Sequence, residues 1–260
     1  MQDIKVTLIQ ADQIWEDKSA NFSMYENYFR QISETDIIIL PEMFHTGFSM
    51  SVDQLAEDWQ DSSGIDFLKK WSKQLQSAIY TSLIIREAGK IVNRGVFVFP
   101  DGSISTYDKR KSFGLGGEDQ FFTAGEKETI VTWRGWKINL QICYDLRFPE
   151  LIRNRMEGEE AEYDLLLYVA NWPEKRISHW DTLLQARAIE NQCYVIGVNR
   201  VGTDGKGLIY SGGTVIYDML GQRLNSARNN QAEIVFSTLP GDKLMDTRKT
   251  LPFLKDCSIK

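Results

Sequence analysis

The sequence contains few cysteines, histidines and prolines. Its 260 residues include three cysteines, two histidines and six prolines. An odd and sparse set of cysteines is typical of a protein kept reduced inside the cell, and it argues against a disulfide-rich scaffold. No pair of histidines or cysteines has the spacing of a zinc site. We therefore expect a cytoplasmic protein that holds no metal ion.

Long apolar runs and an excess of positive charge are also missing. The longest apolar runs, residues 37–40 and 165–170, are far shorter than the about 20 residues that cross a bilayer. The first residues, Met1 to Ile4, lead directly into a strand-like run and show no signal-peptide pattern. The formal net charge is -6, whereas nucleic-acid-binding proteins usually present a basic face. We expect neither a membrane nor a nucleic acid as a partner.

The composition that remains is that of an ordinary globular protein. Hydrophobic residues make up 42% of the chain and charged residues 25%, which excludes disordered and fibrous classes. No internal repeat or change of composition divides the chain, so we predict a single domain over residues 1–260. Residues from Gly241 onward form a polar tail without a clear period, and we expect this tail to be irregular.

Hydrophobic periodicity alternates along the chain between strand-like and helix-like segments. Apolar residues at helical spacing predict helices over residues 21–33, 65–77 and 173–190. Short apolar or alternating runs predict strands, including residues 36–40, 103–107, 137–142 and 163–170. A hairpin is predicted at Asp101-Gly102. The mixed order of strands, hairpins and helices predicts an α/β fold built in layers and not a purely parallel sheet.

Three reactive side chains follow predicted strands. Glu42, Lys109 and Cys143 each stand just beyond the carboxyl end of one of these strands. Functional sites of α/β folds form at such strand ends. If the three strands are parallel neighbours, the three side chains converge on one site.

The position of Cys143 favours two routes to a reactive sulfur. A helix expected to start near Phe148 would place its N-terminus close to the thiol, where the dipole favours the thiolate. An ammonium on Lys109 would act in the same direction. Alternatively, Glu42 takes the thiol proton as a general base.

These residues also have ordinary interpretations. A cysteine after a strand is more often a small buried side chain than a nucleophile, and Lys109 lies in a charged stretch that could be a solvated turn. The glycine-rich segment 114–117 lacks the spacing of a nucleotide-binding loop. A thiol protease would need His45 or His179 beside Cys143, and neither histidine follows a predicted strand as Glu42 does.

Three segments together form a more specific pattern. Residues 40–44 (LPEMF), 107–110 (YDKR) and 142–150 (ICYDLRFPE) resemble the Glu, Lys and Cys motifs of the nitrilase superfamily, in the family's order. The resemblance extends over nearly the whole chain, from Lys5 to Phe253.

This resemblance implies both a fold and a set of roles. The fold would be a four-layer α-β-β-α sandwich, and the enzyme would need no cofactor. Cys143 would be the nucleophile, Glu42 the general base and Lys109 the oxyanion partner, while Glu118 best matches the family's second active-site glutamate. The family usually forms homodimers, and the tail 241–260 would be able to reach the partner.

A narrower resemblance concerns the substrate. Residues 170–173 (ANWP), 187–191 (RAIEN) and 197–202 (GVNRVG) look like the omega-amidase branch, the 2-oxoglutaramate amidases. The substrate would then be the small monoamide of a dicarboxylic acid. One segment departs from that branch, because residues 111–113 read Lys-Ser-Phe where many relatives have His-Leu-Phe. These residues belong to the loop next to the expected substrate site, so the departure affects the shape of that loop.

The far carboxylate of such a substrate needs a cation. Arg147 is the candidate, because a guanidinium holds a carboxylate through two parallel hydrogen bonds. The alternative is that Arg147 pairs with Asp145 or Glu150 and only shapes the turn. The candidate pocket walls, for which core packing is an equal explanation, are Phe44, Tyr144, Asn171 and Trp172.

Other functions stay open at this point. The same chemistry could act on an N-carbamoyl amino acid or an aliphatic amide. The alternative from a different functional class is a non-catalytic relative that uses its dimer surface for binding. The presence of Glu42, Lys109 and Cys143 together argues against it.

Overall fold

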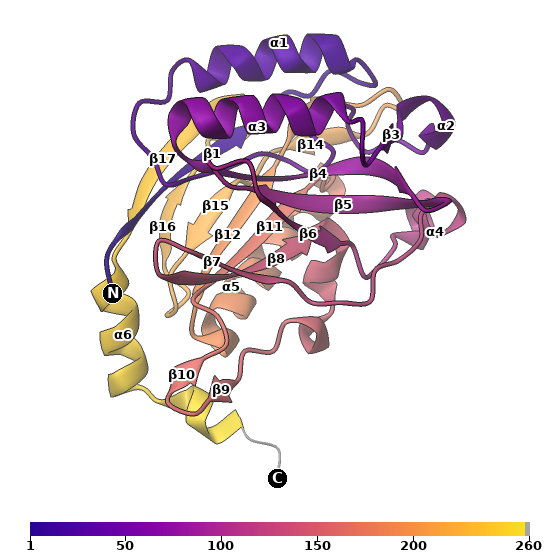
Figure 1. The fold of residues 1–260 in the computed structure, drawn as a ribbon. Coiled ribbons are helices and arrows are strands. Elements are labelled where there is room, and N and C mark those ends of the chain that lie inside the picture. Colours follow the sequence, from indigo (N-terminus) through magenta and orange to yellow (C-terminus); the bar gives the residue numbers. More distant parts are fainter. Residues whose placement is uncertain (258–260) are drawn as a thin grey trace.

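The computed structural model describes residues 1–257, and its centre consists of two β-sheets packed face to face (Figure 1). The first sheet has the order β17-β1-β2-β4-β5-β6, and β3 pairs with β4 outside this path. Its strands are β1 (Ile4–Gln10), β2 (Ile37–Ile39), β3 (Glu57–Asp58), β4 (Ala78–Glu87), β5 (Lys90–Val98), β6 (Ile104–Asp108) and β17 (Glu233–Leu239).

The second sheet has the order β16-β15-β12-β11-β8-β7. Its strands are β7 (Ile130–Trp133), β8 (Trp136–Ile142), β11 (Leu165–Ala170), β12 (Tyr194–Asn199), β15 (Val215–Tyr217) and β16 (Arg223–Ser226). Two short hairpins stand apart, namely β9 (Met156–Glu157) with β10 (Glu160–Ala161), and β13 (Val201–Thr203) with β14 (Ile209–Ser211).

Helices cover the outer faces of both sheets. The α-helices are α1 (Lys18–Phe29), α2 (Val52–Leu55), α3 (Ser63–Leu75), α4 (Glu118–Phe121), α5 (Ile177–Asn191) and α6 (Gly241–Thr250). The short 3-10 turns are η1 (Gly114–Gly116), η2 (Cys143–Arg147), η3 (Pro149–Leu151), η4 (Glu174–Arg176) and η5 (Phe253–Cys257). Figure 1 shows α1 and α3 over the first sheet and α5 on the opposite side of the molecule.

Side-chain alternation explains why the layers stack in this way. In β1, Leu8 belongs to the core between the sheets, whereas its neighbour Ile9 belongs to the core under α1 and α3, because successive strand residues point to opposite faces. The rings of Phe29 in α1 and Trp71 in α3 meet at a centroid distance of 5.2 Å. The predicted α-β-β-α sandwich is confirmed.

Two sequence predictions about local structure are wrong. No α-helix starts near Phe148, where the chain forms only the turns η2 and η3. Pro149 separates the two turns, because it disfavours the helical conformation at Phe148. The chain leaves the helical conformation again at Ile152, whose side chain is buried in the core between the sheets.

The tail is the second correction. Residues Gly241–Thr250 form helix α6 and not an irregular segment. Leu244 is buried, Arg248 pairs with Asp164 at 2.6 Å, and Asp242 lies in the first turn, where the helix dipole favours an acidic residue. Tertiary contacts therefore fold a segment whose own periodicity is weak. Residues 258–260 of the predicted tail lie outside the described residues.

The three strands that precede the reactive side chains are not neighbours in one sheet, so the condition stated from the sequence for their convergence is not met. In the first sheet, β4 and β5 separate β2 from β6, and β8 belongs to the second sheet. β2 is parallel to β4, while β5 is antiparallel to both β4 and β6, so β2 and β6 run in the same direction. Glu42 and Lys109, which follow β2 and β6, therefore approach Cys143, which follows β8, across the sandwich.

No helix within residues 1–257 has both the length and the apolar character needed to cross a membrane.

Candidate active site

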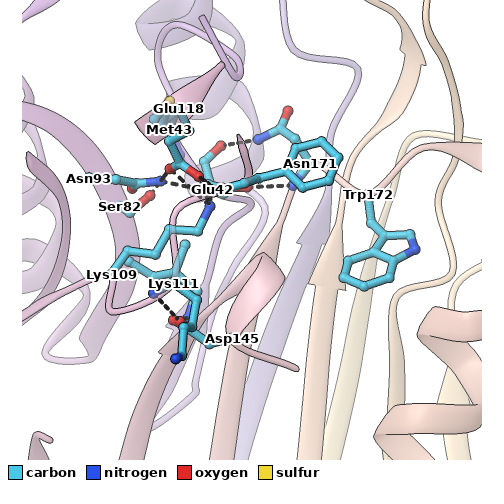
Figure 2. A network of polar contacts seen from close by, with 12 residues as sticks. Glu42, Met43, Ser82, Asn93, Lys109, Lys111, Glu118, Asp145, Asn171 and Trp172 are labelled. Carbon is cyan, nitrogen blue, oxygen red and sulfur yellow. Dashed lines mark hydrogen bonds and ion pairs between the residues drawn. The ribbon is translucent and has the colours of Figure 1, made fainter. Parts of the chain in front are cut away.

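A buried ammonium group joins two buried carboxylates at one end of the sandwich (Figure 2). The Nζ atom of Lys109 lies 3.0 Å from Oε1 of Glu42 and 2.8 Å from Oε2 of Glu118. The Nδ2 atom of Asn93 donates to both carboxylates, at 2.8 Å to Glu42 and 3.1 Å to Glu118. These side chains are at most 3% exposed, so their mutual contacts replace solvation by water.

Backbone groups fix the orientation of Glu42. Its Oε2 atom accepts a hydrogen bond from the backbone N–H of Asn171 at 2.9 Å, and its carbonyl oxygen accepts from the Asn171 side chain at 2.6 Å. The side chain of Gln13 donates to the carbonyl oxygens of Glu42 and Met43. Met43 has a φ of 47°, in the left-handed region, and its N–H donates to Ser82. The loop after β2 therefore holds one carboxylate in a single orientation.

Cys143 stands on a strained turn. It is the first residue of η2, directly after β8, and has a φ of 46°. A residue other than glycine adopts such a φ at an energetic cost, and this strain is concentrated at functional sites. The side chain is buried but lines a cavity, so its sulfur faces the space in which a small molecule would fit.

The electrostatics of the site keep the Cys143 thiol protonated. Burial raises the pKa of Cys143 well above its usual value, and the charges of Glu42 and Glu118 raise it further, while Lys109 opposes them. Of the two routes considered from the sequence, the resting thiolate is therefore disfavoured, because the helix expected to stabilise it is absent and one ammonium faces two carboxylates. The pKa of Lys109 is raised: burial lowers it, but Glu118 and Glu42 outweigh burial. The arrangement therefore suits removal of the thiol proton by Glu42.

The cavity beside Cys143 has a volume of about 300 Å³. Tyr144, Asn171 and Trp172 line it, as the sequence analysis predicted for its walls. Phe113, from the segment that departs from the omega-amidase pattern, also lines it and packs against Tyr144 at a ring distance of 5.0 Å. The loop after Lys109 thus still contributes an aromatic wall.

Arg147 also lines the cavity, and aromatic rings hold it in place. Its guanidinium carbon lies 4.7 Å from the centroid of Trp172 and 5.9 Å from that of Tyr144. Its hydrogen-bond contact is with Nδ1 of His179 at 3.3 Å. Within residues 1–257 Arg147 forms no ion pair, so the pairing with Asp145 or Glu150 weighed from the sequence is not present.

Two further cations, Arg176 and Lys206, line the same cavity and form no ion pair with any residue of the described chain. Among the residues that line the cavity, the carboxylate is Asp204. It accepts hydrogen bonds from the backbone N–H groups of Lys206 and Leu208 and from the Tyr210 hydroxyl. The cavity wall therefore carries uncompensated positive charge, which favours an anionic ligand.

Phe44 does not line the cavity. It is fully buried in the core under α1 and α3, and its ring stacks on His45 at 4.8 Å. Other aromatic side chains surround Phe44 in this core, where an apolar ring is more stable than it would be in the polar site. Core packing, the alternative explanation, therefore holds for Phe44.

The two histidines are engaged elsewhere. Nε2 of His45 lies 3.1 Å from Glu57, and burial lowers the pKa of His45 while Glu57 opposes this shift. His179 contacts Arg147. Within residues 1–257 no hydrogen bond joins either histidine to Cys143, so the arrangement lacks a Cys–His pair.

Some residues of the site were not identified from the sequence. Asn93 bridges the two carboxylates, and its signal is weak, because it is a polar side chain next to Arg94 in a strand whose other central residues are apolar or glycine. Gln13 has no such signal, because it lies in a loop far from Glu42 in the sequence. Among residues 1–257 no group of three or more His, Cys, Asp and Glu side chains is arranged to hold a metal ion.

Comparisons with known proteins identify the family of the chain. The family model of the carbon-nitrogen hydrolases matches residues 5–249. The omega-amidase YafV of Yersinia enterocolitica is 43% identical over 256 residues, covering 98% of this chain and 97% of that protein. The 2-oxoglutaramate amidase of Bacillus subtilis is 29% identical over 255 residues, covering 96% of each chain.

A solved structure is similar along the entire chain. It is a CN-hydrolase superfamily protein from Xanthomonas campestris, described with an arsenic adduct in its active site. It is 38% identical, has a TM-score of 0.97, and the match covers 100% of this chain and 99% of that one. The chain therefore belongs to the carbon-nitrogen hydrolase family, within the nitrilase superfamily, and is a hydrolase of carbon–nitrogen bonds other than peptide bonds.

Proposed function

We propose that the protein hydrolyses the terminal amide of a small 2-oxo dicarboxylic acid monoamide, of the 2-oxoglutaramate type, to the acid and ammonia. The observation that carries this proposal is the guanidinium of Arg147, which lines the cavity of Cys143 and forms no ion pair within residues 1–257. A buried or half-buried cation without a carboxylate partner offers a substrate carboxylate two parallel hydrogen bonds. The names of the omega-amidase and 2-oxoglutaramate amidase relatives support the same substrate class.

The first half of the reaction releases ammonia. Glu42 accepts the proton of the Cys143 thiol as the sulfur attacks the amide carbon. The resulting oxyanion is stabilised by Lys109 and by the backbone N–H of Tyr144, and each such donor typically contributes about 2.7–4 kcal/mol. When the carbon–nitrogen bond breaks, Glu42 returns the proton to the departing nitrogen. Ammonia leaves, and the acyl group remains on Cys143 as a thioester.

The second half of the reaction hydrolyses the thioester. Glu42, again a carboxylate, accepts a proton from water as the water oxygen attacks the thioester carbon. The carbon–sulfur bond breaks, and the sulfur recovers the proton from Glu42. Glu118 supports both halves, because it holds Lys109 at 2.8 Å and keeps the ammonium beside the carbonyl oxygen. A single carboxylate thus serves as base and acid in turn.

Ammonia release from 2-oxoglutaramate tests the nucleophile. Wild type should release ammonia from it, and Cys143→Ala should abolish this release. Glutamine and an N-carbamoyl amino acid, measured beside it, test the substrate class. Cys143-dependent release from one of these compounds, with none from 2-oxoglutaramate, would keep the mechanism and overturn the substrate. No Cys143-dependent release from any of them would overturn the function.

The role of Arg147 has its own test. Arg147→Met keeps an apolar side chain against Trp172 but removes the charge. A hydrogen-bonded charge pair contributes about 1.5–3 kcal/mol, so the KM for 2-oxoglutaramate should rise at least about tenfold. Hydrolysis of a small neutral amide by the same variant serves as the control and should change little. An equal loss with both compounds would show that Arg147 supports the structure and does not bind the carboxylate.

A further inference from the structure

Asp145 is a fully buried carboxylate close to the nucleophile. Its Oδ2 atom accepts hydrogen bonds from the hydroxyl of Tyr107 at 2.8 Å and from the backbone N–H of Ile142 at 3.2 Å. Its Oδ1 atom accepts from the backbone N–H of Lys111 at 2.9 Å (Figure 2). None of these contacts involves a substrate group, and the mechanism above does not use Asp145.

The donors come from both sheets of the sandwich. Tyr107 lies in β6 of the first sheet, and Lys111 lies in the loop that follows it. Between them stands Lys109, the residue that holds Glu42 and Glu118. Ile142 ends β8 of the second sheet, and its neighbour is the nucleophile. One carboxylate thus connects the segment that carries the ammonium with the turn that carries the sulfur.

We propose that Asp145 is a positioning residue, which fixes the Cys143 turn of the second sheet against the Lys109 loop of the first. The inference rests on the proposed role of Cys143 as nucleophile. It assigns to the Asp145 carboxylate an effect on the catalytic step that packing alone would not give.

The turn needs such a contact. Cys143 has a φ of 46° at the start of a 3-10 turn of five residues, a strained conformation that persists only where the surroundings enforce it. The bond from the Ile142 N–H to Asp145 closes this turn. Burial raises the pKa of Asp145 to about 6, while Lys109 and the hydrogen bond from Tyr107 oppose burial. At neutral pH the group is ionised and accepts all three hydrogen bonds.

Asparagine is an informative replacement at this position. It has nearly the shape of aspartate but presents one acceptor oxygen and one NH2 donor. If the oxygen faces Lys111, the NH2 group faces the N–H of Ile142. If the oxygen faces Ile142, the NH2 group faces the N–H of Lys111. The first orientation places two donors against each other within the Cys143 turn, and the second places them between this turn and the Lys109 loop, so Asp145→Asn should displace the turn or its contact with the loop.

The experiment compares Asp145→Asn with Asp218→Asn. Asp218 is also fully buried, accepts from the backbone N–H groups of Leu220 and Gln222, and pairs with Lys243. It is a matched control because it holds a turn in the same way, but its partners belong neither to the Cys143 turn nor to the Lys109 loop. A displacement of about 1 Å can cost about 10²-fold in rate. We expect the kcat of Asp145→Asn for 2-oxoglutaramate to fall by about this factor, with KM nearly unchanged.

A second measurement does not depend on the substrate. The rate of Cys143 alkylation by iodoacetamide, without any amide present, should change in Asp145→Asn and stay at the wild-type value in Asp218→Asn. Wild-type kcat and alkylation in a folded Asp145→Asn protein would overturn the positioning role. The same fall of kcat in Asp218→Asn would also overturn it, because the effect would then be one of general stability.

Two further variants separate the possible failures. If Asp145→Asn does not fold, Tyr107→Phe removes one of the three donors and keeps the ring. Its kcat should fall several-fold, and a kcat equal to wild type would overturn the proposal. Cys143→Ala tests the proposed function itself: ammonia release that survives in this variant refutes the nucleophile, whereas a normal Asp145→Asn enzyme refutes only the positioning role.

Discussion

At the residue scale, the distribution of charge around Lys109 determines how the sulfur can react. One ammonium lies against two carboxylates, at 3.0 Å from Glu42 and 2.8 Å from Glu118. A thiolate on Cys143 would add a second uncompensated negative charge to a buried site. The protonated thiol and the general-base route follow from this count of charges.

A substitution at Glu118 tests this charge balance. The Glu118 charge is one cause of the raised pKa of Cys143, so Glu118→Gln should lower that pKa and leave more thiolate at a given pH. Alkylation of Cys143 at pH 8 should therefore become faster, and its pH profile should shift to lower pH. The kcat for amide hydrolysis should fall, because Lys109 loses a charged partner that orients it.

The pH profiles of iodoacetamide labelling in wild type and Glu118→Gln provide the measurement. In wild type the labelling rate should still rise above pH 9, as expected for a thiol with a raised pKa. A wild-type rate that is already constant at pH 7 would mean that the resting enzyme holds a thiolate, and the charge argument would then be wrong.

At the scale of elements, the close packing of α5 on the second sheet depends on a glycine. Gly197 lies in β12, directly under α5. An added methyl group there would overlap with Leu184 and lie 2.6 Å from a ring carbon of Trp180. The helix lies this close to the strand because the residue is glycine.

Gly197→Ala should therefore destabilise the protein by about 1–3 kcal/mol, as extra atoms in packed cores usually do. Urea denaturation measures this loss. Leu184→Ala alone opens a cavity and is also destabilising. Combined with Gly197→Ala it makes room for the new methyl group, so the double variant should lose less stability than the two single losses together. Strict additivity would contradict the close packing of α5 on β12.

The elements also show where sequence reasoning was sufficient. Periodicity located the buried strands that became β2, β8 and β11, because β2 and β11 are short apolar runs and β8 alternates between apolar and polar residues. It failed for α6, whose stability comes from contacts such as Arg248 with Asp164, distant in the sequence. It also failed after Cys143, where Phe148 and Ile152 leave the helical conformation and the chain forms only short turns.

At the scale of the whole molecule, the site exists only where the two sheets meet. Glu42, Lys109 and Glu118 come from the first sheet and its loops, and Cys143 and Asn171 follow strands of the second. The motifs predicted which residues are involved, but they gave no information on strand pairing. The sequence left open whether the three strands are parallel neighbours. They are not, and the side chains converge because the two sheets face each other.

The same limit explains which site residues were missed. Asn93 and Gln13 act through contacts that depend on tertiary structure, and Phe44 faces the core because of rings contributed by α1 and α3. The homodimer and the cytoplasmic location stay predictions from the sequence.

The central claim is that the acyl group passes through Cys143, and the first turnover of 2-oxoglutaramate tests it most directly. The enzyme is mixed with substrate and quenched in acid at increasing times. Ammonia, 2-oxo acid and the mass of the peptide containing Cys143 are then measured in each sample. The account predicts that ammonia appears before the acid and that the difference is found as an acyl group on Cys143. Ammonia and acid that appear together from the first time point, with no acylated chain in any sample, would contradict it.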